Sequence, residues 1–438
     1  MKVAVIGGGL AGSECALSLA RSGIYVDLYE MRPYMMSPAH RTGNFAELVC
    51  SNSLKSTELH NAHGVLKAEM EIMESVLLQV AKESSLTAGR ALVVDREQFA
   101  QKVTELIESD SNIKVIREEV KEIPEADFVV VATGPLTSDA FTEYLHKLVG
   151  ERFLNFYDAV APVVTSESID MSRMYFKDRH GEDDDIYLNI PLTKEEYYRF
   201  VEELRLAEIH EPHLKEDKDF FEACLPIEVM AQRGYETLRF GPMRPDGLIP
   251  PGESREPYAV VQLRAENHEK TLFSMVGFQT QLKIKEQERI FRMLPGMENA
   301  EFAVYGKIHR NTYIDSPRVL DSYLRLKWND RIFFAGQIIG TEGYVEAIWG
   351  GLIVSIFIRS IIKDGVLPPL PDTTTMTGAL LSYITSYPHP DFKPMNANFG
   401  ILSPVHFRIR GKDRRIFKAE RAIRNLKVWK GKHLSRIF

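Results

Sequence analysis

One of the three cysteines stands where a purely structural cysteine is seldom found. Cys50 lies in TGNFAELVCSNSLKS (42–56), with apolar residues before it and small polar residues after it. A thiol on a small polar loop can meet a substrate, and its thiolate is a strong nucleophile. The alternative interpretation is a buried thiol without a chemical role.

The other two cysteines differ in their surroundings. Cys15 lies in the apolar helical pattern SECALSLA, which predicts a thiol packed in the core. Cys224 stands in CLPIEVMAQRGYETLRFGPMRP and is followed by Arg233, Arg239 and Arg244. Cationic neighbours raise the thiolate fraction, so Cys224 is a second candidate reactive thiol, again with a buried thiol as the alternative. The spacing of the three cysteines fits neither a disulfide framework nor a metal site, and their small number fits a reducing cytoplasm.

The start of the chain predicts a dinucleotide-binding βαβ unit. The strand KVAVIG (2–7) runs into GGGLAG, a helical pattern continues to position 20, and IYVDLYE (24–30) is the next strand. Glycines allow the tight turn and the approach of a pyrophosphate to the helix N-terminus, while an acid at the second strand end bonds a ribose. The candidate binding residues are Gly7, Gly8, Gly9, Leu10, Ala11, Gly12 and Glu30.

Two later apolar strands favour a flavin over a nicotinamide as the bound dinucleotide. DFVVVATGP (127–135) ends in Thr133 and Gly134, and RIFFAGQIIG (331–340), with Gly336 and Gln337, precedes a helix expected to start near Val345. Flavoproteins of the glutathione-reductase type carry both elements, and their late helix directs its positive end at the flavin. The alternative is a pair of ordinary parallel strands. Because no second GxGxxG occurs, NAD(P)H is expected only as a visiting reductant.

The expected fold is α/β, a glutathione-reductase-type FAD-binding Rossmann-like domain with an inserted α+β domain. The FAD-binding domain is expected at 1–157 and 325–438, and the insertion at 158–324. The insertion combines helical KEEYYRFVEELRLAE (194–208), strand-like SMVGFQTQL (274–282), a Pro/Gly-rich loop (241–257) and a solvated turn, RHGEDDDI (179–186). The apolar run 345–362 carries charges and glycines, which favours a buried helix over a membrane span, and the N-terminus lacks a signal-peptide pattern.

The sequence resembles the folate- and FAD-dependent tRNA (uracil-5-)-methyltransferase family. The resemblance is carried, over almost the whole chain, by VIGGGLAGSECA (5–16), the Cys50 segment, ALVVDREQFA (91–100), CLPIEVMAQRG (224–234), GPMRPDGL (241–248), FAGQIIGTEGYVEA (334–347) and GALLSYIT (378–385). It implies methylation at carbon 5 of the T-loop uridine (position 54) of tRNA. The one-carbon unit would come from 5,10-methylenetetrahydrofolate through reduced FAD, with NAD(P)H as reductant.

The resemblance also assigns roles to single residues. A thiolate added to carbon 6 of uracil makes carbon 5 nucleophilic, and a second group must remove the proton left on carbon 5. The resemblance makes Cys224 the expected nucleophile and Cys50 the proton-handling partner, and the sequence leaves the two roles exchangeable. It implies a backbone contact to the adenine at Val120, in the strand-like REEVKEI. The candidates for binding uracil or folate, each with a plain alternative as a turn or packing residue, are Asn52, Ser53, Lys55, Glu342 and Tyr344.

The charge distribution suggests where RNA binds. The net charge is −7, but the last 33 residues hold 12 Lys and Arg against two acidic residues. Such a basic segment is typical of a site for a polyanion, and binding there would weaken with added salt. A solvated basic helix that ends the chain is the alternative. The candidate tRNA contacts are Arg408, Arg410, Lys412 and Arg414, and neither a membrane nor an obligatory protein partner is expected.

Two other functions are compatible with the sequence. A flavin oxidoreductase acting on a small molecule would keep its turnover after both Cys50 and Cys224 are replaced. A wobble-uridine-modifying tRNA flavoprotein is the second alternative, and its usual long helical C-terminal extension is not expected here. A methyltransferase that uses S-adenosylmethionine fits the dinucleotide fingerprint poorly.

Overall fold

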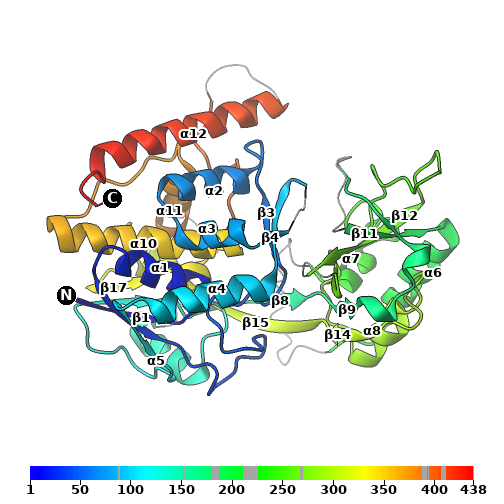
Figure 1. The fold of residues 1–438 in the computed structure, drawn as a ribbon, viewed down its shortest axis with the longest axis horizontal. Coiled ribbons are helices and arrows are strands. Elements are labelled where there is room, and N and C mark those ends of the chain that lie inside the picture. Colours follow the sequence, from blue (N-terminus) through cyan, green and yellow to red (C-terminus); the bar gives the residue numbers. More distant parts are fainter. Residues whose placement is uncertain are drawn as a thin grey trace.

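The computed structural model describes residues 1–86, 89–150, 153–179, 187–210, 225–266, 270–386, 392, 394–405 and 411–437. It shows two lobes joined by a long antiparallel pair of strands, β8 (Phe153–Val160) and β15 (Lys307–Ile314) (Figure 1). The architecture is the expected α/β fold with an inserted α+β domain.

The first lobe is built on a six-stranded sheet in the order β16-β17-β7-β1-β2-β6. The four pairings among β17, β7, β1, β2 and β6 are parallel, and only the edge strand β16 is antiparallel. In β1, β7 and β17, short apolar runs lead into glycine turns, as is typical of strands buried on both faces of a parallel sheet. Their bounds are β1 (Lys2–Ile6), β2 (Tyr25–Tyr29), β6 (Ile113–Ile116), β7 (Phe128–Val131), β16 (Arg325–Leu326) and β17 (Asn329–Phe334).

Helices pack around this sheet and complete the first core. A small antiparallel sheet, β3-β5-β4, lies on the side facing the insertion (Figure 1). The helices are α1 (Leu10–Ala20), α2 (Ala62–Ile72), α3 (Val76–Glu83), α4 (Arg96–Ser109), α5 (Asp139–Val149), α9 (Ser316–Val319), the 3-10 turn η4 (Gly336–Ile339), α10 (Tyr344–Asp364), α11 (Met376–Ser386) and α12 (Gly411–His433). The small sheet consists of β3 (Ser53–Ser56), β4 (Ser85–Leu86) and β5 (Ala91–Val94).

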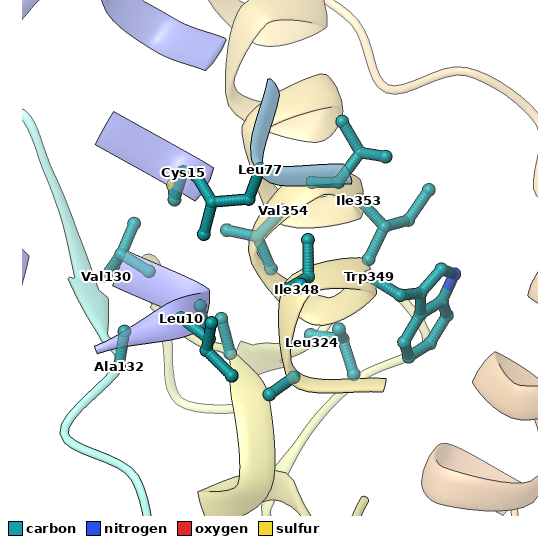
Figure 2. Packing of buried hydrophobic residues seen from close by; sticks show 14 of the residues in the cluster. Leu10, Cys15, Leu77, Val130, Ala132, Leu324, Ile348, Trp349, Ile353 and Val354 are labelled. Carbon is teal, nitrogen blue, oxygen red and sulfur yellow. The ribbon is translucent and has the colours of Figure 1, made fainter. Parts of the chain in front are cut away.

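The centre of this core is the pair α1 and α10. Figure 2 shows Cys15 among apolar side chains such as Leu77 and Val354, and Cys15 is 0% exposed, so the predicted core thiol is confirmed. Burial raises the pKa of the Cys15 thiol far above its ordinary value, which makes it inert. The helix α10 is long and apolar enough to cross a membrane, but 89% of its apolar window is buried, as predicted for a core helix.

Two buried carboxylates attach helices to this core. Glu14 in α1 accepts hydrogen bonds from the N–H groups of Val76 and Leu77, at the first turn of α3. Glu69 in α2 accepts the N–H groups of Met376 and Thr377, at the first turn of α11, both at 2.7 Å. A helix N-terminus has unpaired N–H groups and a positive partial charge, which a carboxylate satisfies. Burial nevertheless raises the pKa of Glu69 to about 7.

The second lobe has its own six-stranded sheet and its own core. The strand order is β10-β11-β12-β13-β9-β14, and all its pairings are antiparallel. Its elements are β9 (Val163–Thr165), the 3-10 turns η1 (Ser166–Ser168) and η2 (Met171–Arg173), β10 (Tyr175–Phe176), β11 (Tyr187–Leu192), α6 (Lys194–Leu206), α7 (Ile227–Arg233), β12 (Ala259–Ala265), β13 (Leu272–Met275), α8 (Ile284–Phe291) and β14 (Phe302–Val304). After the insertion, the chain returns to the core of the first lobe at Ile314, before the domain boundary expected at position 325.

Local predictions for the insertion had mixed outcomes. The helix expected over 194–208 is α6, and 241–257 is a loop as expected. The single strand expected over 274–282 is wrong, because β13 ends at Met275 and Gly277, with φ +77, turns the chain. The expected turn at 179–186 lies outside the described residues except for position 179.

Candidate functional site

The glycine turn after β1 opens into a pocket at the carboxyl ends of the parallel strands. Its walls include Gly7, Gly9, Glu30, Val120 and Thr133, which come from four separate segments of the sequence. Ligands of open parallel sheets bind at this edge. The pocket lining therefore contains five of the twelve residues expected to hold the dinucleotide. Val120 is reached by a loop and not by a strand, because β6 ends at Ile116.

The glycines of this turn differ in what a side chain would meet. A Cβ at Gly12 would lie 1.8 Å from the carbonyl oxygen of Gly7, so this position packs helix against strand. A Cβ at Gly9 would meet nothing within 4 Å, which leaves room beside the N-terminus of α1. An open space over unpaired helix N–H groups fits a pyrophosphate. Gly8 is close to Phe45, while Leu10 and Ala11 are buried in the first core.

Glu30 is held by polar groups on one side of the pocket. One carboxylate oxygen accepts the N–H of Gly8 at 2.9 Å, and the other accepts Nε of the buried Arg32, also at 2.9 Å. Burial alone would raise the pKa of Glu30, but the hydrogen bond and the charge of Arg32 lower it below 4.5. The N–H and Nη2 of Arg32 donate as well, at 3.0 and 3.1 Å, so each oxygen of Glu30 already accepts two hydrogen bonds. A ribose hydroxyl at this carboxylate would have to share or replace one of these donors.

The late glycine turn lies against the N-terminal one. A Cβ at Gly336, with φ +80, would lie 2.6 Å from that of Ala11, so η4 contacts the first turn of α1. Gln337 belongs to η4, and Gly134, with φ +69, ends the β7 turn. The N-terminal glycine turn and η4, more than 300 positions apart in the sequence, therefore lie side by side, as a dinucleotide bound along both would require.

Cys50 lies in a second cavity, between the two lobes. This cavity has a volume of about 420 Å³, and its lining includes Cys50 with residues from α4, from the end of β12 and from the β14 loop. His40 lines both this cavity and the dinucleotide pocket, so the two adjoin. A space of this size between domains is typical of a substrate site.

The loop of Cys50 is held by Tyr344, the first residue of α10. The Tyr344 hydroxyl oxygen accepts the N–H of Cys50 at 2.6 Å and that of Ser51 at 3.0 Å. Burial and the nearby Cys50 raise the pKa of this phenol above 10, so it stays protonated. Tyr344, predicted as a substrate residue, therefore positions the loop. Glu342 is buried, and its backbone N–H donates to Met395.

The polar residues after Cys50 take different places. Asn52 is 0% exposed, and its amide donates to the carbonyls of Val94 at 3.1 Å and of Ala265 at 3.0 Å. It therefore ties the Cys50 loop to both lobes, which is the packing role left open as the alternative for this residue. Ser53 and Lys55 lie in β3, half-buried, and Lys55 has φ +61.

Sequence reasoning overlooked several ionisable residues near this region. His63 Nε2 lies 3.3 Å from the fully buried Glu346, and this contact lowers the pKa of Glu346 against the effect of burial. Burial lowers the pKa of Lys67 to about 7, although Glu346 raises it in part. Arg96 and Glu266 form an ion pair in the Cys50 cavity. Arg96 lies within the family-like segment 91–100, which was the one available signal.

Three predicted site residues, Cys224, Arg408 and Arg410, lie outside the described residues. Lys412 and Arg414 are exposed at the start of α12. Other cations of α12 dock the helix on the first lobe: Lys430 donates to the carbonyl of Ile72 at 2.7 Å, and Lys418 donates to that of Leu402 at 3.1 Å. Only part of the basic charge is thus available to a polyanion.

Comparison with known proteins agrees with this geometry. The family model "Glucose inhibited division protein A" matches residues 2–365. The methylenetetrahydrofolate–tRNA-(uracil-5-)-methyltransferase TrmFO of Dictyoglomus thermophilum is 54% identical over 427 residues, 97% of each chain. The enzyme of the same name from Aquifex aeolicus is 52% identical over 98% of this chain and 96% of its own. A solved structure of Aquifex aeolicus GidA has a TM-score of 0.67 at 17% identity, covering 98% of this chain and 76% of that one, which shows a shared fold. The chain belongs to the methylenetetrahydrofolate–tRNA-(uracil-5-)-methyltransferase family, within the glucose inhibited division protein A group.

Proposed function

We propose that this protein methylates carbon 5 of the T-loop uridine of tRNA, using FAD, 5,10-methylenetetrahydrofolate and NAD(P)H. The observation that carries the proposal is the 54% identity to a methylenetetrahydrofolate–tRNA-(uracil-5-)-methyltransferase over 97% of both chains. A generic oxidoreductase on a shared fold would not explain identity at this level across both lobes.

The dinucleotide pocket supports FAD as the resident cofactor. Gly9 leaves open space over the N-terminus of α1, and the charged Glu30 and Thr133 line the same pocket. Gly336 and Gln337 would lie along the rest of the cofactor. Bound FAD supplies the redox step that carries the one-carbon unit to the pyrimidine and reduces it to a methyl group.

The chain itself supplies the acid–base and nucleophilic groups. Addition of a thiolate to carbon 6 of uracil makes carbon 5 a nucleophile, and a base must then remove the carbon 5 proton. We assign the first role to Cys224 and the second to Cys50, with exchange of the roles as the alternative assignment. The cavity that Cys50 lines adjoins the dinucleotide pocket at His40, which fits a pyrimidine reacting beside the cofactor.

Access of the uridine requires the folded tRNA to be opened locally. Unpairing and unstacking a base costs a few kcal/mol, which contacts to the phosphate backbone can offset. Lys412 and Arg414 are exposed for such contacts. Arg408 and Arg410 precede them in the sequence and are proposed as further phosphate contacts.

The test uses the purified yellow protein with unmodified tRNA transcript, labelled methylenetetrahydrofolate and NAD(P)H. Label should appear as 5-methyluridine in the T-loop, and a transcript with cytidine at that position is the matched control. A protein that binds and reduces FAD but transfers no label rejects the proposal. Label at the wobble position, or turnover of a small molecule with both Cys50 and Cys224 replaced, would favour the corresponding alternative function.

A further inference from the structure

A buried ion pair crosses from one lobe to the other beside Cys50. Arg96 is the first residue of α4, which Asp95 caps, and Glu266 directly follows β12 of the insertion. The guanidinium and the carboxylate are 2.5 Å apart, with side chains 22% and 6% exposed. Both residues line the 420 Å³ cavity together with Cys50.

Each residue of the pair also has a polar atom that makes no hydrogen bond within the part of the chain that the structure describes. Nε of Arg96 and Oε1 of Glu266 are buried and have no hydrogen-bond partner among the described residues. A buried carboxylate oxygen without a partner is costly, so such an atom in a cavity wall suggests interaction with something that enters or ionises there. Burial disfavours the charge on Arg96, but Glu266, the Tyr344 hydroxyl and the Cys50 sulfur together raise its pKa.

We propose that Arg96 and Glu266 are positioning residues that set the charge of the Cys50 sulfur in opposite directions, with Arg96 favouring the thiolate and Glu266 restraining it. The inference rests on the proposed role of Cys50 as the proton-handling thiol. Arg96 and Cys50 line the same cavity, and a neighbouring cation raises the thiolate fraction of a cysteine.

The balance of the two charges suits a proton acceptor. A thiol beside an uncompensated arginine would stay ionised and would be a poor base, because basicity falls with pKa. Neutralisation by Glu266 keeps the sulfur able both to accept a proton and to release it. Since the two charges come from different lobes, the balance depends on how the lobes meet.

Other ionisable groups also face the cavity and must be considered in any pH profile. They come from the 38–49 loop, from α4, from α10 and from the β14 loop, and are His40, Arg41, Glu47, Glu97, Tyr344 and Tyr305. None of these forms the close pair that Glu266 makes with Arg96. The opposite shifts expected for the Arg96 and Glu266 variants distinguish their effects from the titration of these other groups.

The experiment measures alkylation of Cys50 by iodoacetamide against pH in the purified holoprotein, quantified on the Cys50 peptide by mass spectrometry. Arg96→Gln should raise the midpoint of the profile by about one pH unit, a tenfold loss of thiolate at fixed pH. Glu266→Gln should lower the midpoint. Arg173→Gln, which breaks an exposed 2.5 Å pair with Glu298 in the insertion, should leave it unchanged.

A purely structural role for the pair predicts a different result. Loss of either partner would then loosen the lobe boundary in the same way, and both midpoints would shift in one direction or not at all, which would overturn the proposal. Arg96→Lys should restore the normal midpoint if charge is the cause, and it covers the case in which Arg96→Gln fails to fold. Because alkylation needs neither tRNA nor folate, its outcome is independent of whether 5-methyluridine is formed.

Discussion

The substitution Tyr344→Phe tests how the reactive loop is held. The tyrosine oxygen accepts two backbone N–H groups, from Cys50 and Ser51, at 2.6 and 3.0 Å. Phenylalanine keeps the ring but leaves both donors without that acceptor. A half-buried donor without a partner costs about 1 kcal/mol, so the closed loop should lose roughly 2 kcal/mol. This corresponds to a roughly thirtyfold larger open population.

Amide hydrogen exchange measures this increase in the open population of the Cys50 loop directly. Exchange of the peptide that contains Cys50 and Ser51 should become roughly thirtyfold faster, while peptides of β1 and α10 should exchange as before. Tyr305→Phe is the control, because Tyr305 lines the same cavity and its hydroxyl donates to Glu288 instead. Unchanged exchange at the Cys50 peptide, or an equal rise across the first lobe, would show that the hydroxyl does not hold the loop.

Three further outcomes are expected. The Gly9→Ala variant should fold normally but bind FAD weakly. In the Gly351→Ala variant the added Cβ would lie 2.0 Å from a backbone oxygen of α1, so the melting temperature should fall sharply. Flavin absorbance measures the first effect and calorimetry the second. Because the pKa of Glu69 is raised to about 7 in the folded protein, its contribution to stability is full below pH 4.5 and is lost as the pH rises to about 7. The free energy of unfolding, measured with denaturant, should therefore fall by up to about 3 kcal/mol over this pH range in the original protein, and Glu69→Gln should remove this pH dependence. Replacing both Lys412 and Arg414 with Ala should weaken tRNA binding and reduce its salt dependence by roughly one to two in log–log slope, measured by filter binding.

Much of the fold could be predicted because its signals are local. Apolar runs that end in glycine, at β1, β7 and β17, report strands buried on both faces, and the structure contains all three. The prediction failed where the turn had no such boundary, as at Gly277, whose positive φ ends β13 inside a strand-like run. Periodicity alone cannot show where a residue adopts a left-handed conformation.

The site was predictable only where chemistry lies in a short motif. The glycines and Glu30 could be found from their spacing, and Cys50 from its polar neighbours. The role of Arg96 and Glu266 could not be predicted, because it depends on an ion pair between positions 170 residues apart in the sequence. The two partners of Asn52 could not be predicted for the same reason, because its amide donates to carbonyls of two other segments and no local pattern reveals such contacts.

These long-range contacts make the lobe boundary part of the site. Asn52 links the Cys50 loop to Val94 and to Ala265, and the next residues along both strands lead directly to the charged pair of Arg96 and Glu266. A shift of the insertion relative to the first lobe would therefore alter the path of the loop and the separation of the two charges together.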